Sequence, residues 1–306
     1  MENDFHHWLQ TNIDTSGLIV PLGDDAAVMD WSQRDNCVVT SDLLADGSHF
    51  RLSEADPKRI GRKCLAVNMS DVAAMAATPV AAVVSLLLPR SANLGTDRLA
   101  QQLIEGMLPL AKEFQTRIVG GDTNTWDGLL AINVTMLAVA GARGPLRRDQ
   151  ANVGDVVMVT GHLGGSIHGR HFDFQPRIAE ARQLHENYQL SAGMDISDGL
   201  ALDATRLAAA SGVGIELNLE TVPVNKDVLA RAGQGDAKTS IQHALSDGED
   251  FELLITAAPA IAEQILSEQP LDIPVTAVGQ CIAEAGLFHS SSNGPKPLAA
   301  TGWEHT

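Results

Sequence analysis

The sequence has few aromatic and few basic residues, and each shortage narrows what the protein can be. Aromatic residues make up only 4% of its 306 residues and hydrophobic residues 44%, so the core must be built mainly from aliphatic side chains. That hydrophobic content also argues against wholesale disorder. Lys and Arg number 21 against 38 Asp and Glu, which gives a net charge of −17. Because nucleic acids are bound by Lys- and Arg-rich surfaces, we expect no nucleic-acid partner.

Long apolar runs and closely spaced cysteines are also missing. The longest apolar stretch, residues 80–88, is far too short to span a bilayer, and residues 1–10 show no apolar signal-peptide segment. Cys37, Cys64 and Cys281 lie far apart and form neither a CxxC pair nor a zinc-binding spacing. We therefore expect buried free thiols, no membrane partner and a soluble cytoplasmic protein.

Phosphate-binding motifs that depend on a lysine are absent as well. The pattern GxxxxGK[ST] does not occur, nor does a kinase-type Gly-rich loop with its lysine, and the chain has only six lysines. If the protein handles a nucleotide, metal ions and a few arginines must neutralise most of the phosphate charge. Arg147 and Arg148 are the best candidates, although ordinary surface charge explains them equally well.

Acidic residues, in contrast, recur in short segments that mostly contain glycine and follow an apolar run. A single acid in such a place is readily a turn residue or a helix cap. Six such segments indicate a carboxylate cluster, which repels itself unless cations neutralise it. Mg²⁺ prefers oxygen ligands and usually bridges protein carboxylates to substrate phosphates, so the pattern predicts a nucleotide enzyme with several magnesium ions. The acids that define the segments are Asp25, Asp42, Asp71, Asp122, Asp195 with Asp198, and Glu249 with Asp250.

Individual segments keep alternative interpretations. Asp42 follows a strand-like run and suits either hydrated Mg²⁺ or a turn. Asp71 lies within an apolar helical pattern, where burial without a partner is costly, so it favours a functional role. Asp198 could be a helix N-cap, whereas that explanation does not apply to Asp195. The glycine pair ending at Gly121 could cradle a phosphate or simply form a turn.

Strand-like and helix-like runs are mixed without strict alternation, which favours an α+β fold. The helix-like run 57–77 begins with a proline in its first turn, and Pro109 should kink or break the run 96–114. The Gly-, Pro- and Arg-rich stretch 141–154 is the best boundary, so we predict domains at 1–143 and 144–306. The other predicted helices cover 175–186, 198–210 and 259–269, and the strands 37–40, 80–88, 117–119, 129–140, 156–160, 193–196, 213–219, 251–256 and 275–281.

Seven segments in this order resemble the thiamine-monophosphate kinase family, whose superfamily includes aminoimidazole ribonucleotide synthetase, selenophosphate synthetase and a hydrogenase-maturation protein. The resemblance covers nearly the whole chain. It implies an N-terminal domain that forms a homodimer through its sheet, a C-terminal α+β domain, and ATP bound with several Mg²⁺ ions in the cleft between them. The segments are GDDAAV, TSDLLADGSHF, LAVNMSDVAAM, GGDTN, MDISDGL, ALSDGEDFELL and the terminal GWEH.

The resemblance also implies roles for individual residues. Since it implies no side-chain nucleophile or general base, catalysis would be electrostatic, through Asp71, Asp122 and Asp195. The implied metal ligands are Asp25, Thr40, Ser41, Asp42, Asp71, Asp122, Asp195 and Asp198. The implied nucleotide contacts are Gly121, Asp122, Arg148 and Ser197. The implied contacts to thiamine monophosphate are His49, Glu249 and Trp303.

The sequence departs from the family between Gly165 and Asp195, where the family usually carries a longer helical insert with a His-Pro-Pro-Arg-like stretch. Here only residues 172–177 stand in its place. Three functions follow as hypotheses: phosphorylation of thiamine monophosphate by ATP, another ATP-using reaction of the superfamily, or silent nucleotide binding. A selenide-activating enzyme would need a reactive cysteine in an N-terminal loop, whereas Cys37 lies in a strand-like run.

Overall fold

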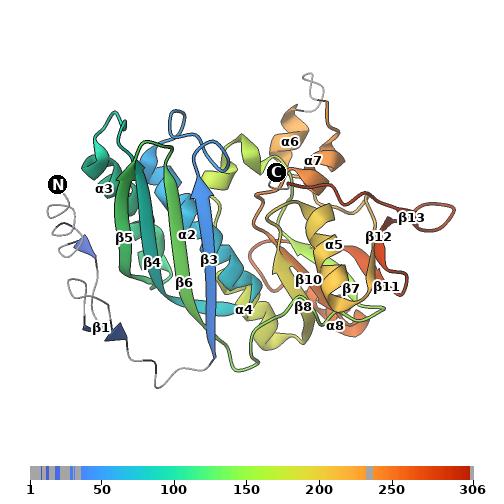
Figure 1. Ribbon diagram of the computed structural model, residues 1–306. Coiled ribbons are helices and arrows are strands. Elements are labelled where there is room, and N and C mark those ends of the chain that lie inside the picture. Colours follow the sequence, from blue (N-terminus) through green and yellow to red (C-terminus); the bar gives the residue numbers. More distant parts are fainter. Residues whose placement is uncertain are drawn as a thin grey trace. The chain divides into compact units, whose positions relative to one another are not determined.

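The computed structural model describes residues 8, 12–13, 18–20, 28–29, 31, 36–231 and 237–303. The chain divides into two compact units (Figure 1). The N-terminal unit comprises Met1–Val72 and Thr78–Ala140, and the C-terminal unit comprises Ala73–Ala77 and Gly141–Thr306. Each unit combines helices with a sheet, which confirms the predicted two-domain α+β fold. Asp25, a predicted metal ligand, lies outside the described residues.

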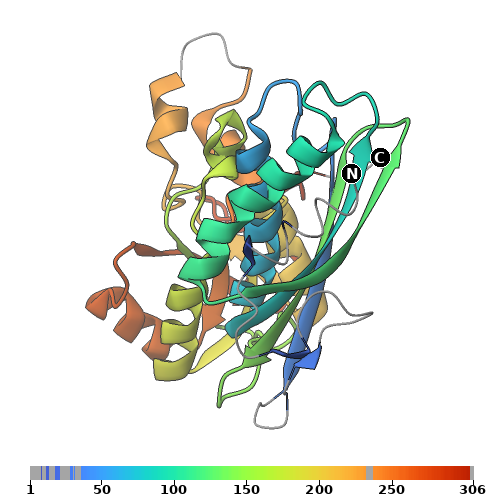
Figure 2. The ribbon, with the colours of Figure 1, turned by 90° about the vertical axis from the view of Figure 1, so that its left-hand side faces the viewer.

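The N-terminal unit is built on a four-stranded sheet with the order β3-β6-β4-β5. Strand β3 pairs antiparallel with β6, and β4 pairs parallel with β5. Two helices, α2 and α3, cover one face of this sheet (Figure 2). The element bounds are β3 Cys37–Ala45, α2 Pro57–Ala74, β4 Ala77–Pro89, α3 Thr96–Glu113, β5 Arg117–Trp126 and β6 Ala131–Ala140, with a small separate sheet of β1 Leu18–Val20 and β2 Val28–Met29.

Helices α2 and α3 approach each other closely through glycine. A Cβ atom at Gly61 on α2 would lie 1.9 Å from the Leu103 carbonyl oxygen on α3, and one at Gly106 would lie 1.9 Å from the Lys58 carbonyl oxygen. The prediction at Pro109 was a kink or a break, and the break is wrong, because α3 continues through this residue to Glu113. The buried face of α3 packs in the core, and that packing outweighs the cost of one lost backbone hydrogen bond.

The other face of this sheet, which we call the open face, is only partly covered by the described residues: Trp31 packs with Val83, Leu137 and Val139 against a small buried cluster of Val80, Ala81 and Val119. Along β6 every second residue is buried, as expected for a strand with one covered face. On the neighbouring edge strand β3, Val39 and Leu43 are 60% and 61% exposed. Cys37 shares their alternation and is an exposed free thiol, so the expectation of burial is wrong for it, while Cys64 and Cys281 are buried and free.

The C-terminal unit is built on a seven-stranded sheet with the order β13-β12-β9-β11-β7-β10-β8. Its strands are β7 Val156–Thr160, β8 Leu190–Asp195, β9 Gly214–Leu217, β10 Leu253–Ala257, β11 Val275–Ile282, β12 Gly286–His289 and β13 Lys296–Pro297. Its helices are α4 Ile178–Asn187, α5 Leu200–Ser211, α6 Lys226–Arg231, α7 Ser240–Ser246 and α8 Pro259–Glu268, with single 3₁₀ turns at Ser166–His168 and Arg170–Phe172.

The core of this unit lies between the sheet and α5, whose Leu200, Ala204 and Leu207 are fully buried. This packing fixes the turn between β8 and α5, which carries three of the predicted site residues. Within the described part of the chain, no helix combines the length and apolarity that crossing a bilayer requires.

Candidate functional site

The N-terminal unit places two carboxylates and a hydroxyl between β3 and α2. The Thr40 Oγ1 donates a 2.5 Å hydrogen bond to Asp71 Oδ2, which joins the strand to the helix. The backbone N–H of Asp42 donates to Asn68 Oδ1 at 3.2 Å, one helical turn before Asp71. Burial, together with the negative charge of Asp71, raises the pKa of Asp42 to about 7. The two carboxylates therefore destabilise each other's charged form and would be stabilised by a cation.

These three side chains fit a magnesium ion chemically, because they offer only oxygen atoms. No group of three or more His, Cys, Asp or Glu side chains that could hold a metal forms among the residues that the structure describes. The six acidic segments come from both units, and Asp25 lies outside the described residues, so the single carboxylate cluster stays a prediction. Thr40, Asp42 and Asp71 are what the N-terminal unit brings together.

Ser41 and Asp122 lie elsewhere in the same unit. Ser41 points to the open face of the sheet, opposite to Thr40, and its Oγ lies 3.0 Å from Thr135 Oγ1. Asp122 is exposed on β5, at the other edge of the sheet from β3, so three strand spacings of about 4.8 Å separate these two edge strands. Its pairing with Ser85, between buried Val84 and Leu86, also puts it on the open face.

Gly121 has a packing reason of its own. A Cβ atom there would lie 1.8 Å from the carbonyl oxygen of Val84 on the paired strand β4. The close approach of two strand backbones therefore requires glycine, whether or not a phosphate binds nearby. Close strand packing is thus a third interpretation of the glycine pair. Gly121 lies inside β5 rather than in a turn.

His49 lies in the turn that follows β3. Its Nδ1 accepts a 3.1 Å hydrogen bond from the Ala45 backbone N–H, so in the neutral ring the proton lies on Nε2. Its carbonyl oxygen accepts a 2.7 Å hydrogen bond from Lys63 Nζ, and Lys63 is fully buried on α2. A hollow of about 560 Å³ begins beside this turn, lined in part by Asp46 and Arg51.

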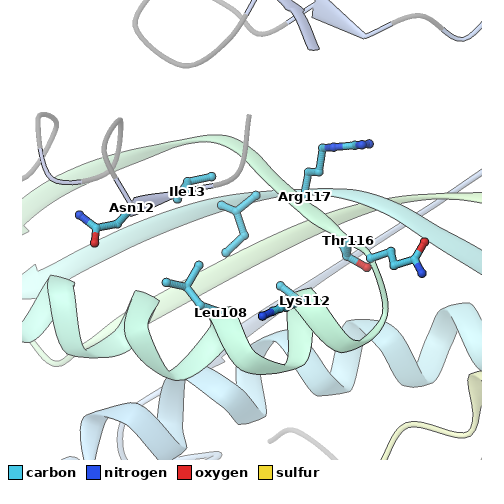
Figure 3. A pocket seen from close by; sticks show the side chains of 9 residues that line it. Asn12, Ile13, Leu108, Lys112, Thr116 and Arg117 are labelled. Atoms are coloured by element: carbon cyan, nitrogen blue, oxygen red, sulfur yellow. The ribbon is translucent and has the colours of Figure 1, made fainter. Parts of the chain in front are cut away.

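A second hollow of the N-terminal unit, about 440 Å³ in volume, lies where α3 ends and β5 begins (Figure 3). Its lining includes Asn12, Ile13, Leu108, Thr116 and Arg117. None of the predicted site residues lines it. The hollow is therefore separate from the carboxylate pair.

In the C-terminal unit, the turn that joins β8 to α5 carries Asp195, Ser197 and Asp198. The buried carboxylate of Asp203 on α5 accepts hydrogen bonds from the backbone N–H groups of Ser197, at 3.0 Å, and Asp198, at 2.9 Å. Burial raises the pKa of Asp203 to about 6, although these hydrogen bonds and a nearby arginine oppose the shift. The cap of this turn is thus Asp203, and the N-cap interpretation of Asp198 is wrong, since Gly199 occupies that position.

Arg206 joins Asp198 of this turn to Asp203 of α5. Its Nη1 lies 2.5 Å from Asp198 Oδ2 and 2.8 Å from Asp203 Oδ1. Asp198 is a predicted metal ligand. In this structure the Arg206 guanidinium already balances its charge. Asp195, the last residue of β8, is only 5% exposed and pairs with Leu253 on β10.

Glu249 and Trp303 are tied to the same turn by backbone hydrogen bonds. The N–H of Glu249 donates to the Ser197 carbonyl at 2.6 Å, and the N–H of Trp303 donates to the Asp198 carbonyl at 3.0 Å. Glu249 has a left-handed backbone with φ of 55°, and the indole-bearing Trp303 is 50% exposed. The structure therefore brings Ser197, Asp198, Glu249 and Trp303 together, although they come from three separate parts of the sequence.

The two candidate arginines differ in their surroundings. Arg147 Nε donates a 2.9 Å hydrogen bond to Asp149 Oδ1, and this pairing raises the pKa of Arg147 and lowers that of Asp149. Arg148 is exposed, and its carbonyl oxygen accepts a 2.8 Å hydrogen bond from Ser211 Oγ on α5. Arg148 is thereby held next to the helix that caps the β8–α5 turn.

Sequence reasoning missed Lys63, Asp203 and Arg206. Lys63 gave a usable signal, because it is a charged residue in the same apolar helical pattern as Asp71. Asp203 and Arg206 are three residues apart, which places them on one helix face directly after the acidic turn. Their spacing could have predicted an ion pair but not the hydrogen bonds back to the turn.

Comparison with known proteins first identifies the superfamily to which the chain belongs. Residues 23–140 match the N-terminal domain of AIR synthase related proteins, and residues 162–290 match the C-terminal domain. The chain is thus a two-domain protein of the AIR synthase superfamily. The thiamine-monophosphate kinase of Rhodopirellula baltica is 40% identical over 276 residues, which cover 88% of this chain and 85% of that protein. This chain belongs to the thiamine-monophosphate kinase family.

Solved structures agree with this placement. The crystal structure of thiamine-monophosphate kinase from Stenotrophomonas maltophilia K279a is 29% identical, with a TM-score of 0.78, and covers 90% of this chain and 92% of that chain. AaThiL complexed with AMPPCP and TMP is 27% identical, with a TM-score of 0.77, and covers 100% of this chain and 96% of that chain. Family membership confirms both the resemblance seen in the sequence and the expectation that the chain is a kinase.

Proposed function

We propose that this protein transfers the γ-phosphoryl group of ATP directly to thiamine monophosphate, which yields ADP and thiamine diphosphate. The observation that carries the proposal is the half-buried carboxylate pair of Asp42 and Asp71, with the Thr40 hydroxyl bound to Asp71. Such a pair suits Mg²⁺ bound to phosphate. The relatives named thiamine-monophosphate kinase, and the one complexed with AMPPCP and TMP, support ATP as the donor and thiamine monophosphate as the acceptor.

The chemistry requires no nucleophile from the protein. The acceptor already carries a phosphate, whose second pKa is near 6, so an oxygen of thiamine monophosphate is ready to attack at neutral pH. That oxygen forms a bond to the γ-phosphorus in line with the bond that breaks, and ADP leaves with the electron pair. What remains for the protein is to position the two phosphates and to neutralise charge.

Both units supply proposed ligands for magnesium. Bound Mg²⁺ would neutralise the phosphate oxygens as charge moves toward ADP. In the N-terminal unit Thr40 holds the carboxylate of Asp71 in place, and in the C-terminal unit Arg206 does so for Asp198. The full proposed set is Asp25, Thr40, Ser41, Asp42, Asp71, Asp122, Asp195 and Asp198, and the proposed nucleotide contacts are Gly121, Asp122, Arg148 and Ser197.

The thiamine end of the acceptor is cationic, and two of its proposed contacts suit a cation. Glu249 supplies a carboxylate, and Trp303 supplies a half-exposed indole that could stack on the thiazolium for about 1 kcal/mol. The third proposed contact is His49, whose backbone carbonyl accepts a hydrogen bond from the buried Lys63 Nζ. These roles extend the family resemblance to residues that the structure places in fixed turns.

We further propose that the protein is a homodimer that acts in the cytoplasm. Val39 and Leu43 alternate on the open face of β3, next to the half-exposed Leu137 and Val139 of β6. An apolar face of this kind on a sheet is typical of an interface between subunits. A second copy of the N-terminal sheet is the proposed partner.

The direct test follows the phosphoryl group. Purified protein is incubated with Mg²⁺, thiamine monophosphate and ATP labelled at the γ-phosphate, and both the thiamine phosphates and the protein are analysed for label. We expect label in thiamine diphosphate and none on the protein. ATP binding without turnover would support silent binding instead, and ADP formation without thiamine diphosphate would indicate a different acceptor. Cys37 lies within β3, which argues against a selenide acceptor.

A further inference from the structure

Two segments of the C-terminal unit that are far apart in sequence pair residue by residue. We name Arg170–Arg177 the anchor segment and Asp247–Glu252 the acidic loop. The anchor segment lies where the chain departs from the family, and the acidic loop carries Glu249. Four contacts join them: Arg170 with Asp250, His171 with Glu249, Phe174 with Phe251, and Arg177 with Glu252.

The outer contacts are buried ion pairs. Arg170 Nη2 lies 3.0 Å from Asp250 Oδ1, and the Asp250 side chain is fully buried. Arg177 binds Glu252 with two nitrogens, at 2.8 Å and 2.5 Å, and the Glu252 side chain is 3% exposed. A bidentate, charge-assisted pair such as Arg177 with Glu252 fixes the orientation of the two side chains as well as balancing their charges. Removing either arginine would leave a buried carboxylate without its counter-charge.

The inner part of the acidic loop has an unusual backbone that needs support. Glu249 and Phe251 have φ of 55° and 52°, in the left-handed region that residues with side chains rarely occupy. The Phe251 ring stacks on Phe174 of the anchor segment, with ring centres 4.1 Å apart and planes 16° apart. The anchor segment thus holds the loop at Glu249 and at the three residues that follow it.

The remaining contact reaches Glu249 itself. His171 Nδ1 lies 2.7 Å from Glu249 Oε2, and the two side chains are 6% and 20% exposed. The imidazole therefore lies against the buried Oε2, while the Glu249 side chain as a whole stays more exposed than the ring. The Glu249 N–H also binds the Ser197 carbonyl, so the backbone and the side chain of this residue are fixed independently.

We propose that His171 is a positioning residue that orients the Glu249 carboxylate toward the cationic thiamine end of the acceptor. This inference rests on the proposed function and adds a residue that does not touch the substrate. It also gives the shortened segment a role, because the anchor segment stabilises the acidic loop that carries Glu249.

The test compares three single variants in the full-length protein. His171→Phe keeps an aromatic ring but removes Nδ1, whereas His171→Asn keeps a nitrogen donor near that position. We expect His171→Phe to raise the KM and Kd for thiamine monophosphate about tenfold, with kcat and the KM for ATP changed less than about twofold. His171→Asn should restore most of the affinity. His168→Phe is the matched control, since His168 is an exposed histidine two residues before the anchor segment and should change neither constant.

A double-mutant cycle separates positioning from a general effect on folding. If His171 acts through Glu249, His171→Phe should have no further effect on thiamine monophosphate binding in a Glu249→Gln background. Equal effects in both backgrounds, or a rise in the KM for ATP that matches the rise for thiamine monophosphate, would overturn the inference while the proposed function stands. A wild-type protein that neither binds nor phosphorylates thiamine monophosphate would overturn both.

Discussion

At the scale of single residues, the structure explains how this acidic chain tolerates buried charge. Lys63 is fully buried and donates to the His49 carbonyl, and Asp203 accepts two backbone N–H groups while contacting Arg206. Asp71 accepts from the Thr40 hydroxyl. Each of these buried or half-buried charges therefore fixes a turn or a strand that carries a proposed site residue.

The carboxylate of Asp71 gives the first prediction. Asp71→Asn should lower kcat by about 100-fold or more, because the amide cannot neutralise a magnesium ion. Asparagine still offers an oxygen to the Thr40 hydroxyl, and removing one charge relieves the repulsion with Asp42, so the melting temperature should stay the same or rise. Steady-state kinetics and thermal unfolding check the two parts.

The matched control for this variant is Asp127→Asn. Asp127 lies in the same unit, its side chain is 83% exposed, and its ion pair with Arg90 should contribute little. Loss of turnover in both variants would argue against a specific role for Asp71. A near-normal kcat in Asp71→Asn would remove it from the proposed metal site.

A second prediction concerns pH and Asp250. Burial raises its pKa to about 7, despite Arg170 and the Gly164 N–H, so the folded state holds a proton that the unfolded chain releases near pH 4. The stabilisation is present below about pH 4 and is lost as the pH rises to about 7. Asp250→Asn lacks this loss, so its melting temperature should gain a few degrees relative to wild type between pH 4.5 and 7.5. If the difference in melting temperature between the variant and wild type shrinks as the pH rises over this range, Arg170 lowers the pKa of Asp250 more than burial raises it.

At the scale of helices and strands, the α2–α3 crossing is the sharpest packing constraint. Gly61→Ala should lower the melting temperature by several degrees, because the added Cβ would lie 1.9 Å from the Leu103 carbonyl oxygen. Helix propensity alone predicts the opposite, a gain in stability of about 1 kcal/mol. The direction of the change in melting temperature therefore shows whether the steric clash or the helix propensity dominates. Gly120→Ala, where a Cβ meets nothing within 4 Å, is the control.

Elements of this size were largely predictable from the sequence, whereas the arrangement of the site was only partly so. The sequence predicted a strand that ends at residue 40, whereas β3 continues to Ala45, so Thr40, Ser41 and Asp42 alternate and cannot all point to one face. The run through Pro109 was misjudged because burial of the α3 face outweighs a local penalty. The capping of the β8–α5 turn by Asp203 depends on tertiary placement that no local pattern encodes.

At the scale of the whole molecule, the open face of the N-terminal sheet predicts self-association. Leu43→Lys should convert the proposed dimer to a monomer, because it places a charge in the proposed interface at a leucine that is 61% exposed. Light scattering coupled to size-exclusion chromatography measures this. Leu229→Lys, at a 56% exposed position of the C-terminal unit, should leave the mass unchanged. A wild-type protein that is monomeric at micromolar concentration would contradict the proposed interface.

We propose that this chain uses ATP and magnesium to phosphorylate thiamine monophosphate. The ratio of thiamine diphosphate to ADP formed by the wild-type protein, followed with increasing Mg²⁺, tests this function. We expect one thiamine diphosphate for each ADP, at a rate that continues to rise after Mg²⁺ exceeds ATP because more than one ion is needed. ADP without thiamine diphosphate, or no product at any Mg²⁺ concentration, would contradict it.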